Sequence, residues 1–111
     1  MEIKRVGVVG FGVLGSGIAL ICVEHGYPVV VQDLTDELVS KGVEGLRAIL
    51  AREVEKGRMT PEQGDAILSR LRGTTLMEDL RESDIVIEAV PENMAIKMKV
   101  FSALDDVCPP K

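Results

Sequence analysis

Residues 3–33 read IKRVGVVGFGVLGSGIALICVEHGYPVVVQD. A short apolar segment, VGVV at 6–9, leads through a glycine-rich turn into a longer apolar segment, and a second short run, PVVV, ends at Asp33. Short apolar runs bounded by glycine or proline are typical of buried strands, whereas the middle segment has the length of a helix. The stretch therefore predicts a strand, a glycine turn, a helix and a second strand tipped by an acid.

The glycines follow the GxGxxG pattern, with Gly10, Gly12 and Gly15, and Ala19 completes the longer GxGxxGxxxA form. A lone GxGxxG is a weak signal, but the flanking strand, helix and acid-tipped strand are the context that a dinucleotide site requires. We expect Gly10 to make the sharp turn out of the strand. We expect Gly12 to let a diphosphate approach the main chain without meeting a Cβ atom.

The start of the predicted helix would hold the anion, because its first backbone N–H groups have no partner within the helix and its dipole favours negative charge. The expected donors are the amides at Gly12, Val13, Leu14 and Gly15. We expect Gly15, Gly17 and Ala19 to keep the helix surface small where it packs on the sheet.

Asp33 follows Gly15 at close to the spacing of about 20 residues that is typical of a ribose-binding acid. A carboxylate there accepts hydrogen bonds from the ribose hydroxyls and repels a 2′-phosphate. The next residues, Leu34 and Thr35, offer no cation to such a phosphate. The sequence therefore favours NAD over NADP as the cofactor.

Composition is that of one soluble, cytoplasmic α/β domain, with 111 residues, 46% hydrophobic residues and a formal net charge of -5. Nucleic acid is an unfavourable partner, because binding its phosphates needs clustered Lys and Arg. No apolar run has the length of a membrane helix, and no signal peptide is expected. Cys22 and Cys108 fit neither a disulfide framework nor a zinc site, so a metal is not expected. The single histidine, His25, is predicted to end the first helix as a solvated residue.

After Asp33 the spacing of apolar residues predicts a helix that ends at Gly57 and a second helix that begins at Thr60. Thr60, Pro61 and Gln63 fit a capping box, and Gly73 is expected to close this second helix. A helical hairpin thus takes the place of the single crossover helix. Such an insertion either contacts a substrate or only covers the sheet.

The rest of the chain predicts two strands and a helix. Thr74 and Thr75 suggest a short strand, IVIEAV at 85–90 suggests a strand buried on both faces, and 93–106 suggests a final helix. Right-handed crossovers give the strand order 3-2-1-4 in a doubly wound, Rossmann-type parallel sheet, with the nucleotide over the carboxyl ends of strands one and four. Glu92 and Asn93 would lie near the nicotinamide ribose, although helix capping explains Asn93 as well. Glu88 would line the same crevice.

The chain resembles the N-terminal NAD-binding domain of the 3-hydroxyacyl-CoA dehydrogenases, including the 3-hydroxybutyryl-CoA enzymes. The resemblance covers essentially all residues and rests on GFGVLGSGIA, KGRMTPEQ, RLRGTTLMEDL and above all DIVIEAVPENMAIKMKVFSALDDVCPP. It implies that Glu92 and Lys97 contact the cofactor and that Lys56 contributes to coenzyme A binding. A serine that some relatives use for coenzyme A corresponds to Ile49, so the resemblance does not carry that contact over.

The resemblance also implies oxidation of the 3-hydroxyl of an acyl-CoA, with hydride passing to NAD and a histidine, oriented by a glutamate, taking the proton. Those residues are expected beyond Lys111, so no catalytic residue is assigned and His25 is not the base. Residues 1–111 are expected to be the nucleotide-binding part, truncated before a fifth strand and without the helical C-terminal domain through which family members commonly dimerise.

Two other functions remain open, a cofactor-binding module without dehydrogenase activity and a related dehydrogenase of a sugar acid or other small hydroxy compound. Truncation would also leave the 85–90 strand with an unpaired apolar edge, which invites aggregation or dimerisation.

Overall fold

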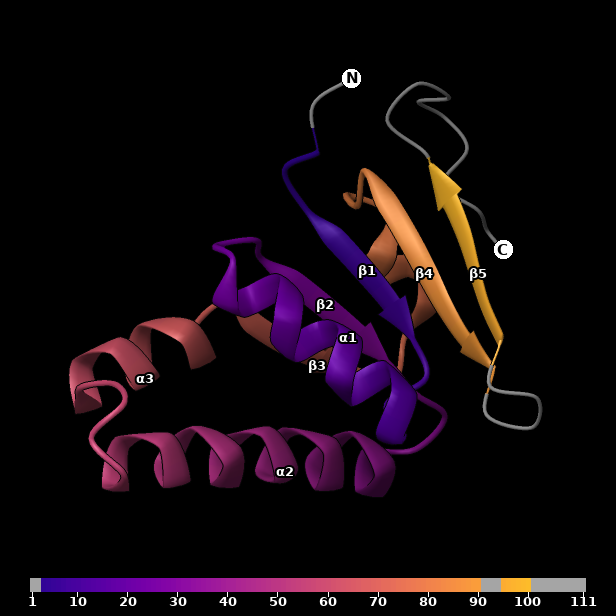
Figure 1. Cartoon of the computed structure of the whole chain (residues 1–111). Coiled ribbons are helices and arrows are strands. Elements are labelled where there is room, and N and C mark those ends of the chain that lie inside the picture. Colours follow the sequence, from indigo (N-terminus) through magenta and orange to yellow (C-terminus); the bar gives the residue numbers. More distant parts are fainter. Residues whose placement is uncertain (1–2, 91–94, 101–111) are drawn as a thin grey trace.

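A computed structural model of the protein describes residues 3–90 and 95–100. Within these ranges the parallel strands are β1 (Val6–Val9), β2 (Val29–Gln32), β3 (Leu71–Thr74) and β4 (Ile85–Val90). They stand in the order β3-β2-β1-β4, with β5 (Ala95–Val100) outside β4 (Figure 1). The predicted order 3-2-1-4 and the Rossmann-type fold are confirmed.

Helices connect the strands as right-handed parallel crossovers require. Helix α1 (Val13–Glu24) passes in front of the sheet, α2 (Asp36–Glu55) runs beneath it, and α3 (Pro61–Leu68) lies near the far end of α2 (Figure 1). A 3₁₀ turn, η1 (Met77–Leu80), precedes β4. This turn was not predicted from the sequence, and it places Leu80 in the core.

Both faces of the sheet carry a core, as a doubly wound fold requires. The larger core joins β1, β2 and β4 to α1 and α2, and its buried members include Val8, Val31 and Leu46. The smaller core packs Leu80 and Val86 with Val9 and Val30. Cys22 is half-buried against the larger core, and burial raises the pKa of its thiol.

The turn between the two helices of the hairpin has the predicted caps, with Gly57 after α2 and Thr60 before α3. The hydroxyl oxygen of Thr60 accepts a hydrogen bond from the Gln63 amide, and the Gln63 side chain accepts one from the Thr60 amide, which completes the capping box. Gly57 follows α2 with a φ of 76°. The end of α2 and the start of α3 could be predicted because each depends on neighbouring residues alone.

Gly73 was predicted wrongly as the end of α3. The helix stops at Leu68, and Gly73 lies inside β3, which begins at Leu71 rather than at Thr74. A Cβ atom on Gly73 would stand 2.4 Å from Val39 Cγ1, so glycine is needed where α2 packs on this edge strand.

The helix predicted over 93–106 is also wrong in its described part, because 95–100 form β5, antiparallel to β4. Its residues alternate between apolar Ile96, Met98 and Val100 and cationic Lys97 and Lys99, a period of two that fits a strand. β5 pairs along the whole of β4, so the expected unpaired edge of β4 is absent. Residues 91–94 and 101–111 of that prediction, with Cys108, lie outside the described residues.

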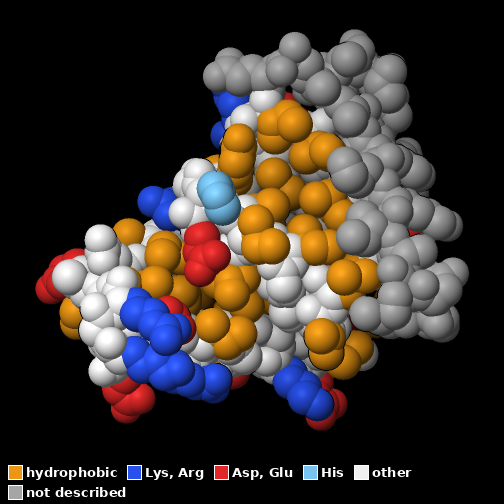
Figure 2. Space-filling model, in the orientation of Figure 1, with side chains coloured by type: hydrophobic (Ala, Val, Ile, Leu, Met, Phe, Trp, Pro, Cys, Tyr) orange, Lys and Arg blue, Asp and Glu red, His pale blue; other side chains and the backbone are white. Residues whose placement is uncertain are grey.

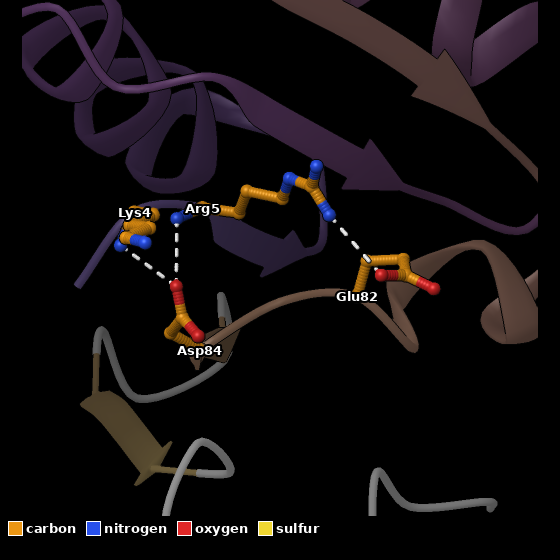
Figure 3. Close-up of polar contacts among 4 residues, drawn as sticks. All are labelled: Lys4, Arg5, Glu82 and Asp84. Carbon is orange, nitrogen blue, oxygen red and sulfur yellow. Dashed lines mark hydrogen bonds and ion pairs between the residues drawn. The ribbon is translucent and has the colours of Figure 1, made fainter. Parts of the chain in front are cut away.

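The amino ends of β1 and β4 are fastened by a cluster that we call the Asp84 clasp, formed by Lys4, Arg5, Glu82 and Asp84 (Figure 3). Asp84 Oδ2 accepts hydrogen bonds from the backbone amides of Lys4 at 2.7 Å and Arg5 at 3.0 Å. The Arg5 guanidinium lies 3.1 Å from Glu82 Oε1. The two amide donors hold the pKa of the Asp84 carboxyl below its usual range.

Candidate dinucleotide site

The loop from β1 to α1 is tightly packed both where it leaves the strand, at Gly10, and where it enters the helix, at Gly15. Gly10 has a φ of 99°, the left-handed region that favours glycine, and its amide donates to Gln32 O at 2.7 Å. A Cβ atom on Gly15 would stand 1.8 Å from Gly10 O. Gly10 therefore makes the predicted sharp turn. Gly15 was expected to pack on the sheet, and its nearest neighbour is the loop at the end of β1, with Val8 Cγ1 of the sheet 3.6 Å from the same Cβ position.

Gly12 and Gly17 differ from Gly15 in their surroundings. A Cβ atom on either would meet nothing within 4 Å. At Gly12 this open space lies at the start of α1, where the prediction needs room for a ligand. Gly17 was predicted to pack on the sheet, and that is wrong, because the residue is exposed. Successive helical residues turn by about 100°, so Gly17 lies on a different face of α1 from Gly15.

The start of α1 presents free donors. Among residues 3–90 and 95–100 no side chain caps the helix, and its first turn contains no acidic residue. Within the described part of the chain, no acceptor is found for the backbone amides of Gly12, Val13, Leu14 and Gly15. Four unpaired N–H groups at the positive end of a helix dipole form a site for an anion.

Asp33 lies just past β2 and contacts this loop directly. Its Oδ2 accepts a hydrogen bond from the Phe11 amide at 2.9 Å, and its Oδ1 accepts one from the Leu34 amide at 2.7 Å. The Asp33 backbone is held as well, because its amide donates to Thr74 O at 3.1 Å. Each carboxylate oxygen can accept a further hydrogen bond, so the group remains available to a ribose.

Gln32 has a structural role here that the sequence analysis did not identify. Its side chain is buried, and Nε2 donates to Asp33 O at 3.1 Å and to Thr75 O at 3.2 Å. These bonds join the ends of β2 and β3 and fix the backbone from which the Asp33 carboxylate projects. A polar residue beside an acid at the end of a predicted strand was the only available signal.

A cavity of about 610 Å³ runs over the carboxyl ends of β1, β2 and β4. Its volume is in the usual range for small-molecule sites. The lining contains the loop from Gly10 to Gly15, together with Gln32, Asp33, Leu34, Leu38, Glu88 and Ala89. Free amides, an acid and an apolar wall thus meet in one cavity, and these groups match the diphosphate, ribose and base of a dinucleotide.

The remaining predicted residues lie in different places. Glu88 lines the cavity, and the register of β4 with β5 pairs it with Lys97. Glu92 and Asn93 lie outside the described residues. His25 follows α1 as its C-cap, with Nδ1 2.8 Å from Ile21 O, and it does not line the cavity.

Lys56 is not brought near the cavity. It is the exposed C-cap of α2, whose 20 residues extend about 30 Å from the end of β2. Lys and Arg side chains gather over the helical hairpin of α2 and α3 (Figure 2). Among the described residues, Lys56 takes part in no ion pair, whereas Arg58 pairs with Glu53. Ile49 lies on the same helix and lines a second cavity of about 520 Å³ between α1 and α2.

The family model for the NAD binding domain of 3-hydroxyacyl-CoA dehydrogenase matches residues 5–111. The chain belongs to this family. A probable 3-hydroxybutyryl-CoA dehydrogenase of Bacillus subtilis is 40% identical over 110 residues, which cover 99% of this chain and 38% of that protein. A glyoxysomal fatty acid beta-oxidation multifunctional protein of Cucumis sativus is 40% identical over 98% of this chain and 15% of that protein.

Solved structures agree with the family. The (S)-3-hydroxybutyryl-CoA dehydrogenase of Ralstonia eutropha is 41% identical with a TM-score of 0.79, over 83% of this chain and 32% of that chain. The 3-hydroxybutyryl-CoA dehydrogenase of Escherichia coli has the same TM-score at 34% identity, over 83% and 20% of the two chains. The chain thus spans well under half the length of these relatives.

Membership of this family makes NAD the cofactor, as the glycine pattern and Asp33 predicted. The free amides of α1, the open space at Gly12 and the carboxylate of Asp33 fit that dinucleotide. Within 3–90 and 95–100, no helix is long and apolar enough to cross a membrane, and no cluster of His, Cys, Asp and Glu could hold a metal ion.

Proposed function

We propose that these residues are the NAD-binding part of a longer protein that interconverts (3S)-3-hydroxyacyl-CoA and 3-oxoacyl-CoA. The observation that carries the proposal is the family match over residues 5–111, which includes the glycine loop, Asp33 and Lys56. Bound NAD supplies the hydride acceptor. The described residues supply binding and orientation, and we place the catalytic base in another part of the protein.

Each cofactor-binding residue has one task in this proposal. The amides of Gly12, Val13, Leu14 and Gly15 hold the diphosphate, and Gly10 provides the turn that presents them. Asp33 binds the adenosine ribose and excludes a 2′-phosphate. Glu92 and Lys97 contact the nicotinamide half. The resemblance supports this assignment, and so does the pairing of Lys97 with Glu88, which lines the cavity.

The acyl-CoA part of the proposal rests on Lys56 and on the names of the relatives. Lys56 is an exposed cation without an ion pair among the described residues, so its charge is available to a substrate phosphate. Because α2 separates it from the cavity, a substrate that contacts Lys56 and also reaches the nicotinamide must be elongated, as coenzyme A thioesters are. We also propose a homodimer and a cytoplasmic location, although two matched plant relatives are named glyoxysomal and peroxisomal.

A second candidate is reduction of another small dicarbonyl compound. It is favoured by a likeness to a diketoreductase described as acting on dicarbonyl compounds, at 27% identity and a TM-score of 0.72. An NAD-binding module without dehydrogenase activity is the third candidate. Both differ from the first in predicting no turnover of a coenzyme A thioester.

Calorimetric titration of the 111-residue chain with NAD and NADP tests the cofactor assignment. Asp33→Ser should weaken NAD binding by about tenfold to 150-fold, since a hydrogen bond to a charged group contributes about 1.5–3 kcal/mol, and should relatively favour NADP. Asp33→Asn keeps an acceptor oxygen, so it should relieve repulsion of NADP with less disturbance of Phe11. Asp36→Asn, outside the cavity, is the control. An unchanged preference in both Asp33 variants removes Asp33 from the ribose site.

Turnover is measured on the longer protein with NAD and 3-hydroxybutyryl-CoA, following NADH absorbance. Lys56→Ala should raise KM for the thioester and leave kcat unchanged, whereas Lys41→Ala, an exposed cation nearer the start of α2, should change neither. Equal KM values in the two variants count against the Lys56 contact. The 111-residue chain alone should bind NAD without turnover, and turnover at an enzyme-like rate would disprove the absence of the base.

A further inference from the structure

Phe11 is buried in the middle of an exposed loop. Its side chain is 5% exposed, whereas the nearby Val13 is 90% exposed and Gly12 is open to solvent. The aromatic ring belongs to the larger core, with Val31 and Leu46. The middle position of GFG therefore points into the protein while the glycines on either side shape the cofactor cavity.

Phe11 is fixed through its backbone as well as its ring. Its amide donates to Asp33 Oδ2 at 2.9 Å, and its carbonyl oxygen accepts a hydrogen bond from Ser16 Oγ at 3.3 Å. One residue thus joins the carboxylate proposed for the ribose to the helix whose amides are proposed for the diphosphate. A loop with glycine at both neighbouring positions has large conformational freedom of its own, and these contacts restrict it.

The ring lies against α2 where that helix has no side chain. A Cβ atom on Gly42 would stand 2.4 Å from Phe11 Cγ and 2.6 Å from both Cδ atoms. Carbon atoms in contact prefer about 3.5–4.0 Å, so any larger residue at 42 must displace the ring by about 1 Å. The colliding atoms are at the base of the ring, so rotation of the ring about its Cβ–Cγ bond leaves Cγ in place and gives little relief.

Phe11 also lies in the wall shared by two cavities, since it lines both the cofactor cavity and the cavity between α1 and α2. Gly42 lines only the second of these. A larger residue at position 42 would therefore displace the Phe11 ring, and with it the glycine loop, without itself contacting the cofactor.

We infer that Phe11 is a positioning residue whose ring, seated on Gly42, fixes the four free amides of α1 at the distance from Asp33 that a dinucleotide needs. The helix α2, and not the glycine loop alone, then determines how the diphosphate is held. This inference rests on the proposed cofactor-binding residues and adds Phe11 and Gly42 to them in an indirect role.

The test compares Gly42→Ala with Gly45→Ala in the 111-residue chain. Both substitutions add one methyl group to α2, but a Cβ atom on Gly45 meets nothing within 4 Å. Binding of NAD, ADP and adenosine is followed by amide chemical shifts, which detect weak ligands. Gly42→Ala should weaken NAD and ADP about tenfold, the loss expected for one hydrogen bond to a charged group, and should leave adenosine nearly unchanged. Gly45→Ala should leave all three unchanged.

A second substitution that restores affinity distinguishes a positioning role of Phe11 from general damage to the fold. Phe11→Ala in the Gly42→Ala background removes Cγ and both Cδ atoms, which are the atoms that collide, and should restore part of the diphosphate affinity. Phe11→Leu alone should remain folded and weaken NAD and ADP more than adenosine, so it serves as the test if Gly42→Ala does not fold.

Three results overturn the inference. Unchanged NAD affinity in Gly42→Ala, or in Phe11→Leu if Gly42→Ala does not fold, refutes the inference and leaves the proposed cofactor site standing. Equal weakening of adenosine and NAD shows general damage and also refutes it. Absence of NAD binding by the wild-type chain refutes both the inference and the proposed site.

Discussion

Replacing Gly15 by alanine should destabilise the domain strongly. The added Cβ atom would stand 1.8 Å from the Gly10 carbonyl oxygen and 2.8 Å from its carbon, and both are backbone atoms that cannot rotate away. The start of α1 must therefore move from β1 by more than about 1 Å to restore contact distances. Overpacking of this kind costs about 1–3 kcal/mol or more, partly offset by about 1 kcal/mol from the better helix propensity of alanine. We expect a net loss of about 2 kcal/mol.

Gly17→Ala is the matched control, on the same helix two residues later. Its Cβ atom meets nothing within 4 Å, so only the propensity gain remains and stability should rise by up to about 1 kcal/mol. Urea unfolding followed by far-UV circular dichroism, with equal slopes in both variants, measures the difference. We expect about 3 kcal/mol between the variants, and stabilities that agree within about 0.5 kcal/mol would refute the close-contact argument. Calorimetry of Gly15→Ala should also show weaker NAD binding, because the amides of residues 12–15 move with the helix.

Two further predictions concern the hairpin and the Asp84 clasp. Thr60→Ala removes one bond of the capping box and should lower the free energy of unfolding by about 1 kcal/mol, whereas Gln63→Glu keeps an acceptor for the Thr60 amide and should be nearly neutral in urea unfolding. The pKa of the Asp84 carboxyl is lowered by amide donors, so its contribution to stability is present above the unfolded pKa of about 3.9 and is lost as pH falls through the lower folded value. The stability difference between wild type and Asp84→Asn should therefore shrink below about pH 4, and a difference that stays constant to pH 2 would contradict this assignment.

Local chemistry explains what could be predicted from the sequence. The turn at Gly10, the uncapped start of α1 and the Thr60 capping box each depend on a few consecutive residues. The order of the parallel strands was predictable because right-handed crossovers leave few alternatives.

Long-range contacts explain what could not be predicted. Gly73 reads as a helix terminator, and only the packing of Val39 from α2 shows that it belongs to a strand. Residues 95–100 fit both a helical stripe and an alternating strand, and the pairing with β4 determines which forms. Phe11 and Gly42 are 31 positions apart in the printed sequence, so no local pattern indicates that they touch.

The Asp84 clasp has a consequence for how the chain folds during synthesis. Asp84 and Lys4, which it joins, are 80 positions apart, and β1 sits between β2 and β4. On the ribosome, β1, α1 and β2 can associate early, but one edge of β1 stays open until β4 has been made. Closing so long a loop is slow compared with local helix formation. A nascent chain that stalls before residue 84 would expose that edge to other chains, so holdase chaperones should favour such arrested intermediates over the finished domain.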